Sequence, residues 1–380
     1  MIDFELTDID KEILALAHRQ AEIGRRYAEY YDKHEDELPP AEFPEASGLD
    51  NPVSLAEEAA DGSSGPRILH SLVMSEIYWG GMALHRGKWG LGNTVLKTVA
   101  TPEQIEKWKN HTIAIAITEP GAGSDPANIR TTATFDRETG EWVINGEKIF
   151  ISQAQSADAA MVFSRFVSPD GSRGMTTFLV EKGTPGFSVG PQLKKLGIRS
   201  HDTCNLLFDN CRIAEFNHIK GDFKSTMSVF NDSRPMVGAM ALGVACAALD
   251  FTREKLGERG IKISYRGGLR SHSAVADRFI RLEAAYEAAL LTVLRSKWLE
   301  QRNAAPKVEA SIAKAAGGKA ARKITQSCIE MLGPEALSEE HPLDRCFRDG
   351  RIFDIYEGAG EIQRLIIARA ILGYTARDLR

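Results

Sequence analysis

The spacing of apolar residues changes twice along the chain, and this pattern constrains the fold more than any other feature of the sequence. Residues 1–112 carry apolar side chains at helical intervals, residues 113–222 contain short runs rich in β-branched and aromatic residues, and residues 223–380 return to helical spacing. Helical and strand periods place side chains on different faces, so one cannot substitute for the other. We therefore predict an α+β protein with three domains at these boundaries: an N-terminal helical domain, a middle β-barrel and a C-terminal helical bundle.

Helix signals occur in both outer regions. Near the N-terminus, Ile9, Ile13 and Leu14 recur at helical spacing, and Thr101-Pro102 combines a favoured N-cap with a proline at the first helical position. In the C-terminal region, a polar cap at residues 231–233 followed by Pro235 predicts a helix start near Met236. Long helical patterns cover residues 236–256, 275–302, 307–332 and 361–372, which predicts a four-helix bundle.

Turn and strand signals dominate the middle region. Residues 141–152 contain two β-rich runs around Asn145-Gly146, which is the strongest short signal for a hairpin. Further strands are predicted at Ala160–Phe166, Thr176–Glu181 and Asn205–Ile213, with glycine and proline between them. Several short strands at this spacing predict a small barrel.

Composition limits the class of protein. The 380 residues are 43% hydrophobic and 26% charged, as in an ordinary globular protein, and a net charge of −5 without a basic cluster argues against nucleic-acid binding. The acidic N-terminus resembles neither a signal nor a transit peptide, and no uninterrupted apolar run reaches the roughly 20 residues of a membrane span. Five dispersed cysteines form no Cys-x-x-Cys pair. We therefore expect a cytoplasmic protein without a metal site or a disulfide framework.

The octapeptide Thr118-Glu-Pro-Gly-Ala-Gly-Ser-Asp125 carries the strongest functional signal. Gly121 and Gly123 allow the backbone to approach a ligand closely, and Pro120 stiffens the turn. The hydroxyls of Thr118 and Ser124 can each donate and accept a hydrogen bond. This combination suits a flat ligand rich in hydrogen-bonding groups and phosphates, whereas a bare Gly-x-Gly would indicate only a turn between two strands.

Together with four other segments, the octapeptide resembles sequences of the acyl-CoA dehydrogenase family. It is similar to the family's flavin loop, and Asn145–Ser152 is similar to the second flavin-contacting stretch. Lys195–Ser200 resembles the segment that closes the barrel, and Ser233-Arg-Pro235 resembles the start of the first bundle helix. The long stretch Arg348–Arg364 resembles the C-terminal signature. The resemblance covers nearly the whole chain and implies a divergent member of the family.

The resemblance implies α,β-dehydrogenation of an acyl-CoA thioester, in which Cα loses a proton and Cβ loses a hydride to FAD. Glu357 would be the catalytic base, and Tyr356 and Gly358 would contact the substrate beside it. Burial before an apolar helix would raise the pKa of this carboxyl toward the working range. A glutamate at a helix start is also explained by the helix dipole alone. Some family members carry the base at the position of Ser233, but a serine cannot act as a carboxylate base.

For FAD and substrate, the resemblance implies contacts from both halves of the chain. Thr118 would lie at the ring edge, Phe150 would pack against the flavin where the family has a tryptophan, and Ser152 would lie near N5. Ser124 would contact the pyrophosphate or the phosphopantetheine of the substrate. Arg234 would lie on the substrate side, although a capping or solvated arginine explains it equally well.

A further part of the cofactor site would come from a neighbouring subunit. The resemblance assigns Arg259 and Gly333 to that part, although Arg259 could equally be a surface charge. It implies a homodimer or homotetramer, an electron-transfer flavoprotein as redox partner, and a role in the breakdown of lipids or organic acids.

Departures from the family pattern fall on this cross-subunit part. The segment after Arg259 is longer than in the family, Pro334 removes one N–H, and Glu330 replaces a neutral amide. Ala359 stands at a hydroxyl position and Glu361 at a glutamine position. Negative charge near a pyrophosphate is unfavourable unless it is screened.

Two alternatives to a self-sufficient dehydrogenase remain open from the sequence. The chain could be a half-competent subunit of a hetero-oligomeric acyl-CoA dehydrogenase, in which a different chain completes the altered site. It could also be an enoyl-CoA reductase or an acyl-CoA oxidase on the same fold, because the same groups serve both directions of the reaction. The acyl group of the substrate is left open.

Overall fold

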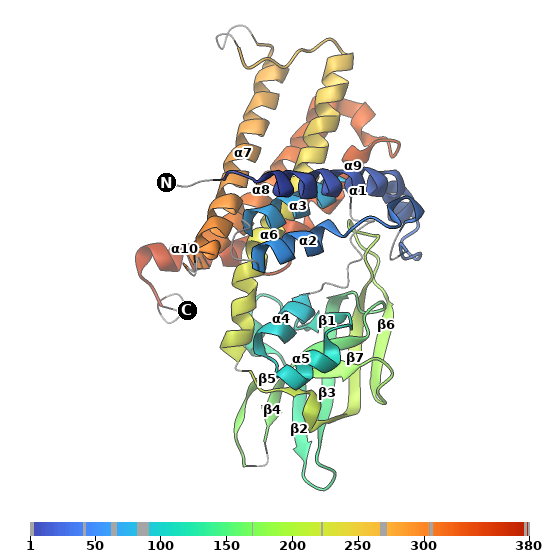
Figure 1. Cartoon of the computed structure of the whole chain (residues 1–380), viewed down its shortest axis with the longest axis vertical. Coiled ribbons are helices and arrows are strands. Elements are labelled where there is room, and N and C mark those ends of the chain that lie inside the picture. Colours follow the sequence, from blue (N-terminus) through green and yellow to red (C-terminus); the bar gives the residue numbers. More distant parts are fainter. Residues whose placement is uncertain are drawn as a thin grey trace.

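A computed structural model gives the arrangement of the chain (Figure 1). It describes residues 4–40, 43–61, 67–81, 91–168, 170–221, 223–266, 272–302, 304, 307–375 and 378. Helices occupy one end of an elongated molecule and a sheet occupies the other, with the long helix α6 (Phe223–Glu258) running between them (Figure 1).

The N-terminal part is helical, as its apolar spacing predicts. Its helices are α1 (Asp8–Lys33), α2 (Pro52–Asp61), α3 (Arg67–Trp79), α4 (Leu91–Val99), α5 (Pro102–Trp108) and the short 3-10 helix η1 (Pro44–Ala46). Thr101 caps α5 by accepting a hydrogen bond from the Gln104 amide, so this predicted helix start is confirmed. α1 to α3 lie with the C-terminal helices, whereas α4 and α5 lie beside the sheet (Figure 1).

The middle region forms one mixed sheet. Its strands are β1 (Ile113–Ala116), β2 (Thr132–Asp136), β3 (Glu141–Ser152), β4 (Ala159–Val167), β5 (Arg173–Glu181), β6 (Phe187–Gln192), β7 (Thr203–Ala214) and β8 (His218–Ile219). They follow the order β6-β7-β3-β2-β4-β5-β8, with β1 beside β4. β1 and β2 run parallel to β4, and the other pairs are antiparallel. The 3-10 helices η3 (Pro126–Asn128) and η4 (Glu215–Asn217) lie between strands.

Both faces of the sheet are covered by apolar side chains. One face surrounds a core that includes Trp142 and Phe178, and the other packs against α4 and α5 through residues such as Trp108. Because successive side chains of a strand point to opposite faces, β4 contributes Val162 to the first core and Phe163 to the second.

The predicted hairpin at Asn145-Gly146 is wrong. β3 runs through this pair, and the turn between β2 and β3 lies at residues 137–140 instead. Gly146 marks a bulge against β7 and has a φ of +147°. A Cβ there would lie 2.7 Å from the Cα of Thr131, so the close approach of two backbone segments requires this glycine.

The C-terminal region is again helical. After α6 come α7 (Ala274–Gln301), α8 (Lys307–Leu332), α9 (Pro342–Asp349) and α10 (Gly360–Leu372), with the 3-10 helices η6 (Gly333–Leu337) and η7 (Ile352–Asp354). α6, α7 and α8 pack on one another, α6 and α7 also pack on α3, and α10 packs on α8. α6 and α8 approach closely at two glycines, because a Cβ on Gly317 would lie 2.7 Å from the Cα of Gly238. This contact fixes the position of α8 relative to α6.

α6 begins earlier than the sequence predicts. Residues 231–233 do not cap it, because the helix starts at Phe223 and contains Pro235 in its interior. A proline removes one intrahelical hydrogen bond, but buried side chains such as Leu242 hold this helix in the core. Over Ser228–Glu258 the helix has the length and mean hydropathy of a membrane span, yet 83% of its most apolar part is buried inside the protein, as in a core helix.

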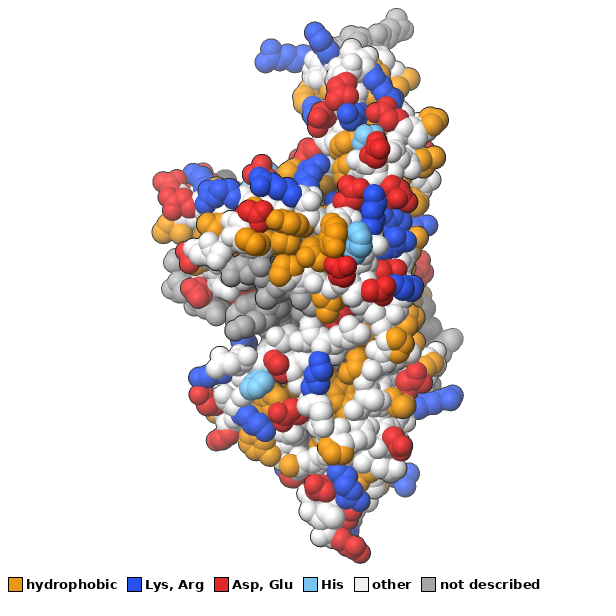
Figure 2. Space-filling model, turned by 90° about the vertical axis from the view of Figure 1, so that its right-hand side faces the viewer, with side chains coloured by type: hydrophobic (Ala, Val, Ile, Leu, Met, Phe, Trp, Pro, Cys, Tyr) orange, Lys and Arg blue, Asp and Glu red, His pale blue; other side chains and the backbone are white. Residues whose placement is uncertain are grey.

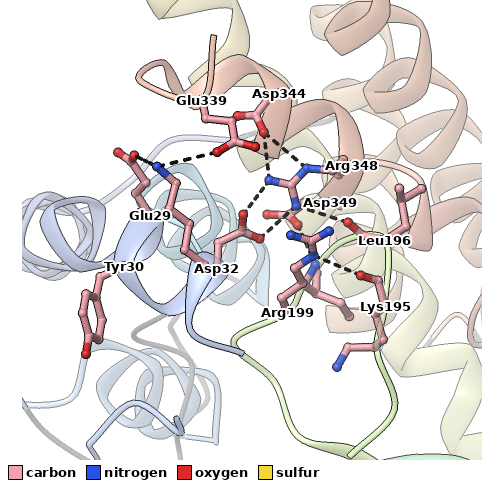
Figure 3. Close-up of polar contacts among 12 residues, drawn as sticks. Glu29, Tyr30, Asp32, Lys195, Leu196, Arg199, Glu339, Asp344, Arg348 and Asp349 are labelled. Atoms are coloured by element: carbon pink, nitrogen blue, oxygen red, sulfur yellow. Dashed lines mark hydrogen bonds and ion pairs between the residues drawn. The ribbon is translucent and has the colours of Figure 1, made fainter. Parts of the chain in front are cut away.

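A partly buried arginine joins three parts of the chain (Figure 3). Arg348 of α9 donates to both carboxylate oxygens of Asp32 in α1, at 2.9 and 2.5 Å, and to the Leu196 carbonyl oxygen at 3.1 Å. The neighbouring Asp349 accepts a hydrogen bond from the Ile198 amide at 2.5 Å. The segment after β6 and the C-terminal signature, which are distant in sequence, therefore meet where the loop toward α10 begins.

Charged side chains of both signs are mixed over the surface. On the face shown in Figure 2, acidic and basic groups lie near one another, with apolar side chains between them. Ion pairs at the surface include Arg212 with Asp136 at 2.9 Å and Lys194 with Asp36 at 2.8 Å. Exposed pairs contribute little stability, so the fold depends on its buried contacts.

Candidate active site

Glu357 lies in the loop between η7 and α10 and has an unusual backbone conformation. Its φ is +52°, and that of the next residue, Gly358, is +91°. A residue other than glycine in the left-handed region is uncommon and strained, so surrounding contacts must hold it there. The side chain is half-buried, and its Oε2 accepts a hydrogen bond of 2.6 Å from the hydroxyl of Ser233 in α6.

The surroundings of this carboxylate raise its pKa. Burial is the main cause, while the hydrogen bond from Ser233 and the positive charges of Lys314 and Arg234 act in the opposite direction. A carboxyl with a raised pKa is a stronger base once it is ionised, and the hydroxyl and the two cations stabilise the ionised form. This arrangement suits proton abstraction near neutral pH.

Two buried residues of this site are not singled out by the sequence, although Gln363 lies within the C-terminal signature. Lys314 of α8 and Gln363 of α10 are wholly buried, and both donate to the Gly358 carbonyl oxygen, at 2.7 and 3.0 Å. A lysine within a helical pattern normally indicates a surface charge. The only hint is Gly317-Gly318, since two glycines inside a helix indicate that another element approaches it closely.

Of the other predicted substrate residues, Arg234 and Tyr356 lie beside the base, whereas Ser124 lies in the octapeptide turn. Arg234 is half-buried, and its Nη1 donates to the side chain of Asn231 at 2.9 Å. Its Nε is buried without a hydrogen-bond partner among the residues that the structure describes. Tyr356 packs against Phe353 with ring centroids 5.8 Å apart, and its hydroxyl lies 3.8 Å from the sulfur of Met240.

The octapeptide forms a tight turn that is held by a buried ion pair. Backbone hydrogen bonds join Glu119 and Ala122 in both directions, at 3.2 and 3.0 Å. The buried Glu119 carboxylate accepts hydrogen bonds from Lys148 at 2.7 Å, from the Thr131 hydroxyl at 2.6 Å and from two backbone amides. Lys148 also donates to the Ile117 carbonyl oxygen at 3.0 Å. These contacts fasten the turn to β3.

A second bulge in β3 turns an aromatic ring outward. It lies between Lys148 and Ile151, and Phe150 within it has a φ of +56°. The bulge shifts the alternation of the strand, so Lys148 is wholly buried while Phe150 is 65% exposed. An exposed aromatic side chain on a strained backbone indicates a functional rather than a packing role.

The other predicted ring contacts lie near Phe150. The Thr118 carbonyl oxygen accepts a hydrogen bond of 2.9 Å from the Ile149 amide, which places the half-buried Thr118 beside the bulge. Ser152 is exposed further along β3, and Ser124 is exposed at the end of the octapeptide turn. The hydrogen bond between Thr118 and Ile149 therefore joins the two stretches that the sequence singles out.

Two family models of known protein domains match this chain. The model of the acyl-CoA dehydrogenase middle domain matches residues 114–211, and that of the C-terminal domain matches residues 222–372. The chain belongs to the acyl-CoA dehydrogenase family. It is 35% identical to an acyl-CoA dehydrogenase of Bacillus subtilis over 269 residues, which cover 70% of each chain. It is also 35% identical to an acryloyl-CoA reductase (NADH) of Anaerotignum propionicum over 266 residues, which cover 68% of this chain and 66% of the reductase.

The fold agrees with this relationship. The structure of butyryl-CoA dehydrogenase from Megasphaera elsdenii is similar with a TM-score of 0.83 and 27% sequence identity, over 98% of this chain and 100% of that one. The predicted fold, with helices before and after a middle sheet, is confirmed as that of the acyl-CoA dehydrogenase family.

Two predicted cofactor residues of this acyl-CoA dehydrogenase family member lie together but away from the base. Arg259 donates to the Leu332 carbonyl oxygen at 2.9 Å, immediately before Gly333, and pairs with Glu335 at 2.5 Å. About 25 residues of α6 separate Arg259 from Arg234, which is roughly 37 Å along a helix. Within one chain, Arg259 and Gly333 therefore do not join the site around the base.

The residues that depart from the family pattern are largely accommodated. Glu330 forms an ion pair with Arg278, and Glu361 is exposed in the first turn of α10. Ala359 occupies the N-cap position of α10 and supplies no side-chain hydrogen bond there. Residues 267 and 268, at the end of the longer segment after α6, lie outside the described residues.

The described part of the chain shows neither a metal-binding cluster nor a reactive cysteine site. It contains no group of three or more His, Cys, Asp or Glu side chains that could hold a metal ion. All five cysteines are free, and burial raises the pKa of the Cys211 and Cys346 thiols to about 11. Thiols of that kind are unreactive at neutral pH.

Proposed function

We propose that the chain is an FAD-dependent acyl-CoA dehydrogenase in which Glu357 removes the α-proton of an acyl-CoA thioester. The observation that carries this proposal is the environment of Glu357, a half-buried carboxylate that is hydrogen-bonded by Ser233 and flanked by two cations. Membership of the acyl-CoA dehydrogenase family supports the reaction class.

The surface formed by β3 and the octapeptide turn fits the flavin of FAD. Phe150 offers an exposed aromatic face, Thr118 and Ser152 offer hydroxyls beside the same bulge, and Ser124 offers one at the end of the octapeptide turn. A phenylalanine that is 65% exposed at a left-handed φ is unfavourable in water and becomes favourable when it packs against a flat ring. When bound, FAD accepts the hydride that leaves Cβ.

Proton removal is the step that the chain's own residues perform. The backbone N–H of Glu357 would hold the thioester oxygen, which acidifies the α-proton, and the Glu357 carboxylate would then take that proton. Ser233 orients the carboxylate through its hydrogen bond of 2.6 Å. The unpaired Nε of Arg234 is available to the substrate. Because the pKa of Glu357 is raised by burial, we expect activity to increase with pH through a value above the ordinary one of a glutamate.

Oligomerisation and electron transfer complete the proposed function. The separation of Arg259 from Arg234 along α6 favours a homodimer or homotetramer, in which Arg259 and Gly333 of one chain complete the cofactor site of another. Electrons would then pass to an electron-transfer flavoprotein. If a different chain completes the site, the protein alone should be colourless and should bind FAD only after that chain is added.

An anaerobic titration monitored by absorbance tests the proposed reaction. The purified protein should be yellow, and one member of a panel of linear, branched, cyclic and steroid-derived acyl-CoAs should bleach it. Glu357→Gln should keep the flavin and abolish bleaching, because it preserves the shape but removes the base. The control Glu138→Gln changes an exposed carboxylate in the turn between β2 and β3, away from the proposed site, and should bleach normally. Bleaching retained by Glu357→Gln would exclude Glu357 as the base.

Enoyl-CoA reduction is a second candidate, favoured by the 35% identity to an acryloyl-CoA reductase (NADH). The same base would then return a proton to Cα. A coupled assay with an electron-transfer flavoprotein distinguishes the two directions. Consumption of NADH that depends on an enoyl-CoA favours the reductase, whereas reduction of the electron-transfer flavoprotein that depends on an acyl-CoA favours the dehydrogenase.

A further inference from the structure

Lys314 is a buried cation beside the loop that carries the proposed base. Its side chain is wholly buried on α8, and its Nζ donates to the Gly358 carbonyl oxygen at 2.7 Å. A buried ammonium group is costly unless its surroundings compensate it, and a carbonyl oxygen compensates it only in part. The position of this lysine therefore calls for a function that an uncharged residue would not supply.

The same carbonyl oxygen is held a second time. Gln363 of α10 is also wholly buried, and its amide nitrogen donates to the carbonyl oxygens of Gly358 at 3.0 Å and Glu357 at 3.3 Å. Two donors from two helices thus converge on the peptide that follows the base. Glu357 has a left-handed φ of +52°, which is strained for a residue other than glycine and needs such support.

Charged groups from several elements face this point. Lys314 lies on α8 and Arg234 on α6, while Asp354 of η7, Glu361 of α10 and Glu357 supply negative charge toward Lys314. The Nη1 of Arg322 lies 3.6 Å from a carboxylate oxygen of Asp354 and partly neutralises the Asp354 charge. Tyr78 of α3 and Tyr356 also face Glu357, and both stay neutral because burial raises their pKa values. Lys314 and Arg234 are therefore the cations that act on the Glu357 carboxylate.

We propose that Lys314 is a positioning residue that holds the Glu357 loop in its strained conformation and keeps the Glu357 carboxylate ionised. This inference rests on the proposed function, because it assigns Lys314 a role only through Glu357. Gln363 also helps to hold the loop, because it donates to the same carbonyl oxygen. It carries no charge, so it cannot help to keep the Glu357 carboxylate ionised. The two residues therefore separate the effect of loop geometry from the effect of charge.

Matched variants test the two tasks. Lys314→Met removes the charge and the donor at similar volume, Gln363→Met removes only a donor, and Lys319→Met removes an exposed lysine of the same helix as a control. We expect Lys314→Met and Gln363→Met to lower kcat by about tenfold to a hundredfold with little change in KM. Only Lys314→Met should move the acid limb of the kcat/KM profile, by about one pH unit to higher pH, because Glu357 loses a favourable positive charge.

A second measurement does not depend on turnover. Amide hydrogen exchange in the protein without FAD should be faster across residues 355–360 in Lys314→Met and Gln363→Met than in Lys319→Met. If Lys314→Met does not fold, Lys314→Gln, which is also uncharged but keeps a donor, should still shift the acid limb. Exchange and pH profiles of the Lys314 variants that match those of Lys319→Met would overturn the inference.

The outcome for Glu357→Gln separates this inference from the proposed function. If that variant still bleaches with acyl-CoA, the assignment of the base fails, whatever Lys314 does. If it does not bleach but the Lys314 and Lys319 variants behave alike, the base stands and only the role of Lys314 fails.

Discussion

Removal of one charge from the buried pair beneath the octapeptide turn should destabilise the fold and weaken FAD binding. Lys148 is wholly buried, Glu119 is 5% exposed, and their charged atoms lie 2.7 Å apart. Burial lowers the pKa of Lys148 to about 8, and Glu119 opposes this change. Lys148→Met keeps most of the volume of the side chain but leaves the Glu119 carboxylate buried without its cation.

The size of the effect follows from the contacts that remain. Without Lys148, Glu119 still accepts hydrogen bonds from the Thr131 hydroxyl and from the amides of Arg130 and Thr131. Breaking a buried pair from one side costs about 3–5 kcal/mol. Because three neutral donors persist, we expect Lys148→Met to lower the free energy of unfolding by about 3 kcal/mol, at the low end of that range. The double variant with Glu119→Gln leaves no uncompensated charge and should be more stable than Lys148→Met alone.

Urea denaturation followed by circular dichroism measures these differences. Lys109→Met, which changes an exposed lysine near the same sheet, serves as the control and should unfold like the unmodified protein. In a fluorescence titration, Lys148→Met should also bind FAD more weakly, since the turn and β3 lose their common anchor. If the double variant loses as much stability as the two single variants added together, the charges are not coupled and the reasoning is refuted.

Phe150→Gly should leave the stability of the FAD-free protein unchanged or raise it by up to about 1 kcal/mol, because glycine adopts a left-handed φ without strain, while FAD binding should weaken. A loss of stability in urea would contradict a functional role for this ring. Burial raises the pKa of Asp349 to about 6, so its protonated form stabilises the fold at low pH, and this contribution is lost as the pH rises through about 6. In urea denaturation between pH 4 and 7, Asp349→Asn should lack this dependence. Glu335→Gln should free Arg259 and tighten FAD binding several-fold with little change in stability, and an unchanged affinity would show that Arg259 does not reach the cofactor.

Long periodic segments were predictable from the sequence because their pattern repeats over many residues. The helix expected at residues 307–332 has those bounds as α8, and the pattern at 275–302 differs from α7 by one residue at each end. Single local signals failed instead. Asn145-Gly146 is a good hairpin turn in isolation, but Gly146 is required by the contact with Thr131, and the packing of α6 overrides Pro235.

The sequence proposes roles for individual site residues only where a motif contains them. The C-terminal signature contains Glu357 and proposes it as the base. The structure shows that Ser233, which is 124 positions away, donates a hydrogen bond to the Glu357 carboxylate. Lys314 has no motif, and its contact with Gly358 spans 44 positions and depends on how α8 packs. Lys148 and Glu119 lie inside two recognised segments, yet nothing in either segment shows that they pair. Sequence patterns therefore indicate candidate reacting groups more readily than they indicate the contacts that hold these groups in place.

Two carboxylates, Glu330 in α8 and Glu335 in η6, bear on the proposed cross-subunit part of the cofactor site. Left unpaired, Glu330 and Glu335 would repel a phosphate group. Each is instead bound by an arginine of the same chain, Arg278 and Arg259 respectively, so neither presents an uncompensated charge. If Arg259 binds FAD of a neighbouring chain as proposed, the obstacle is competition rather than repulsion, since the nitrogen of Arg259 that binds Glu335 cannot also bind a phosphate. A cofactor that must displace a carboxylate gains less from this arginine, so its affinity depends more on the surface around Phe150.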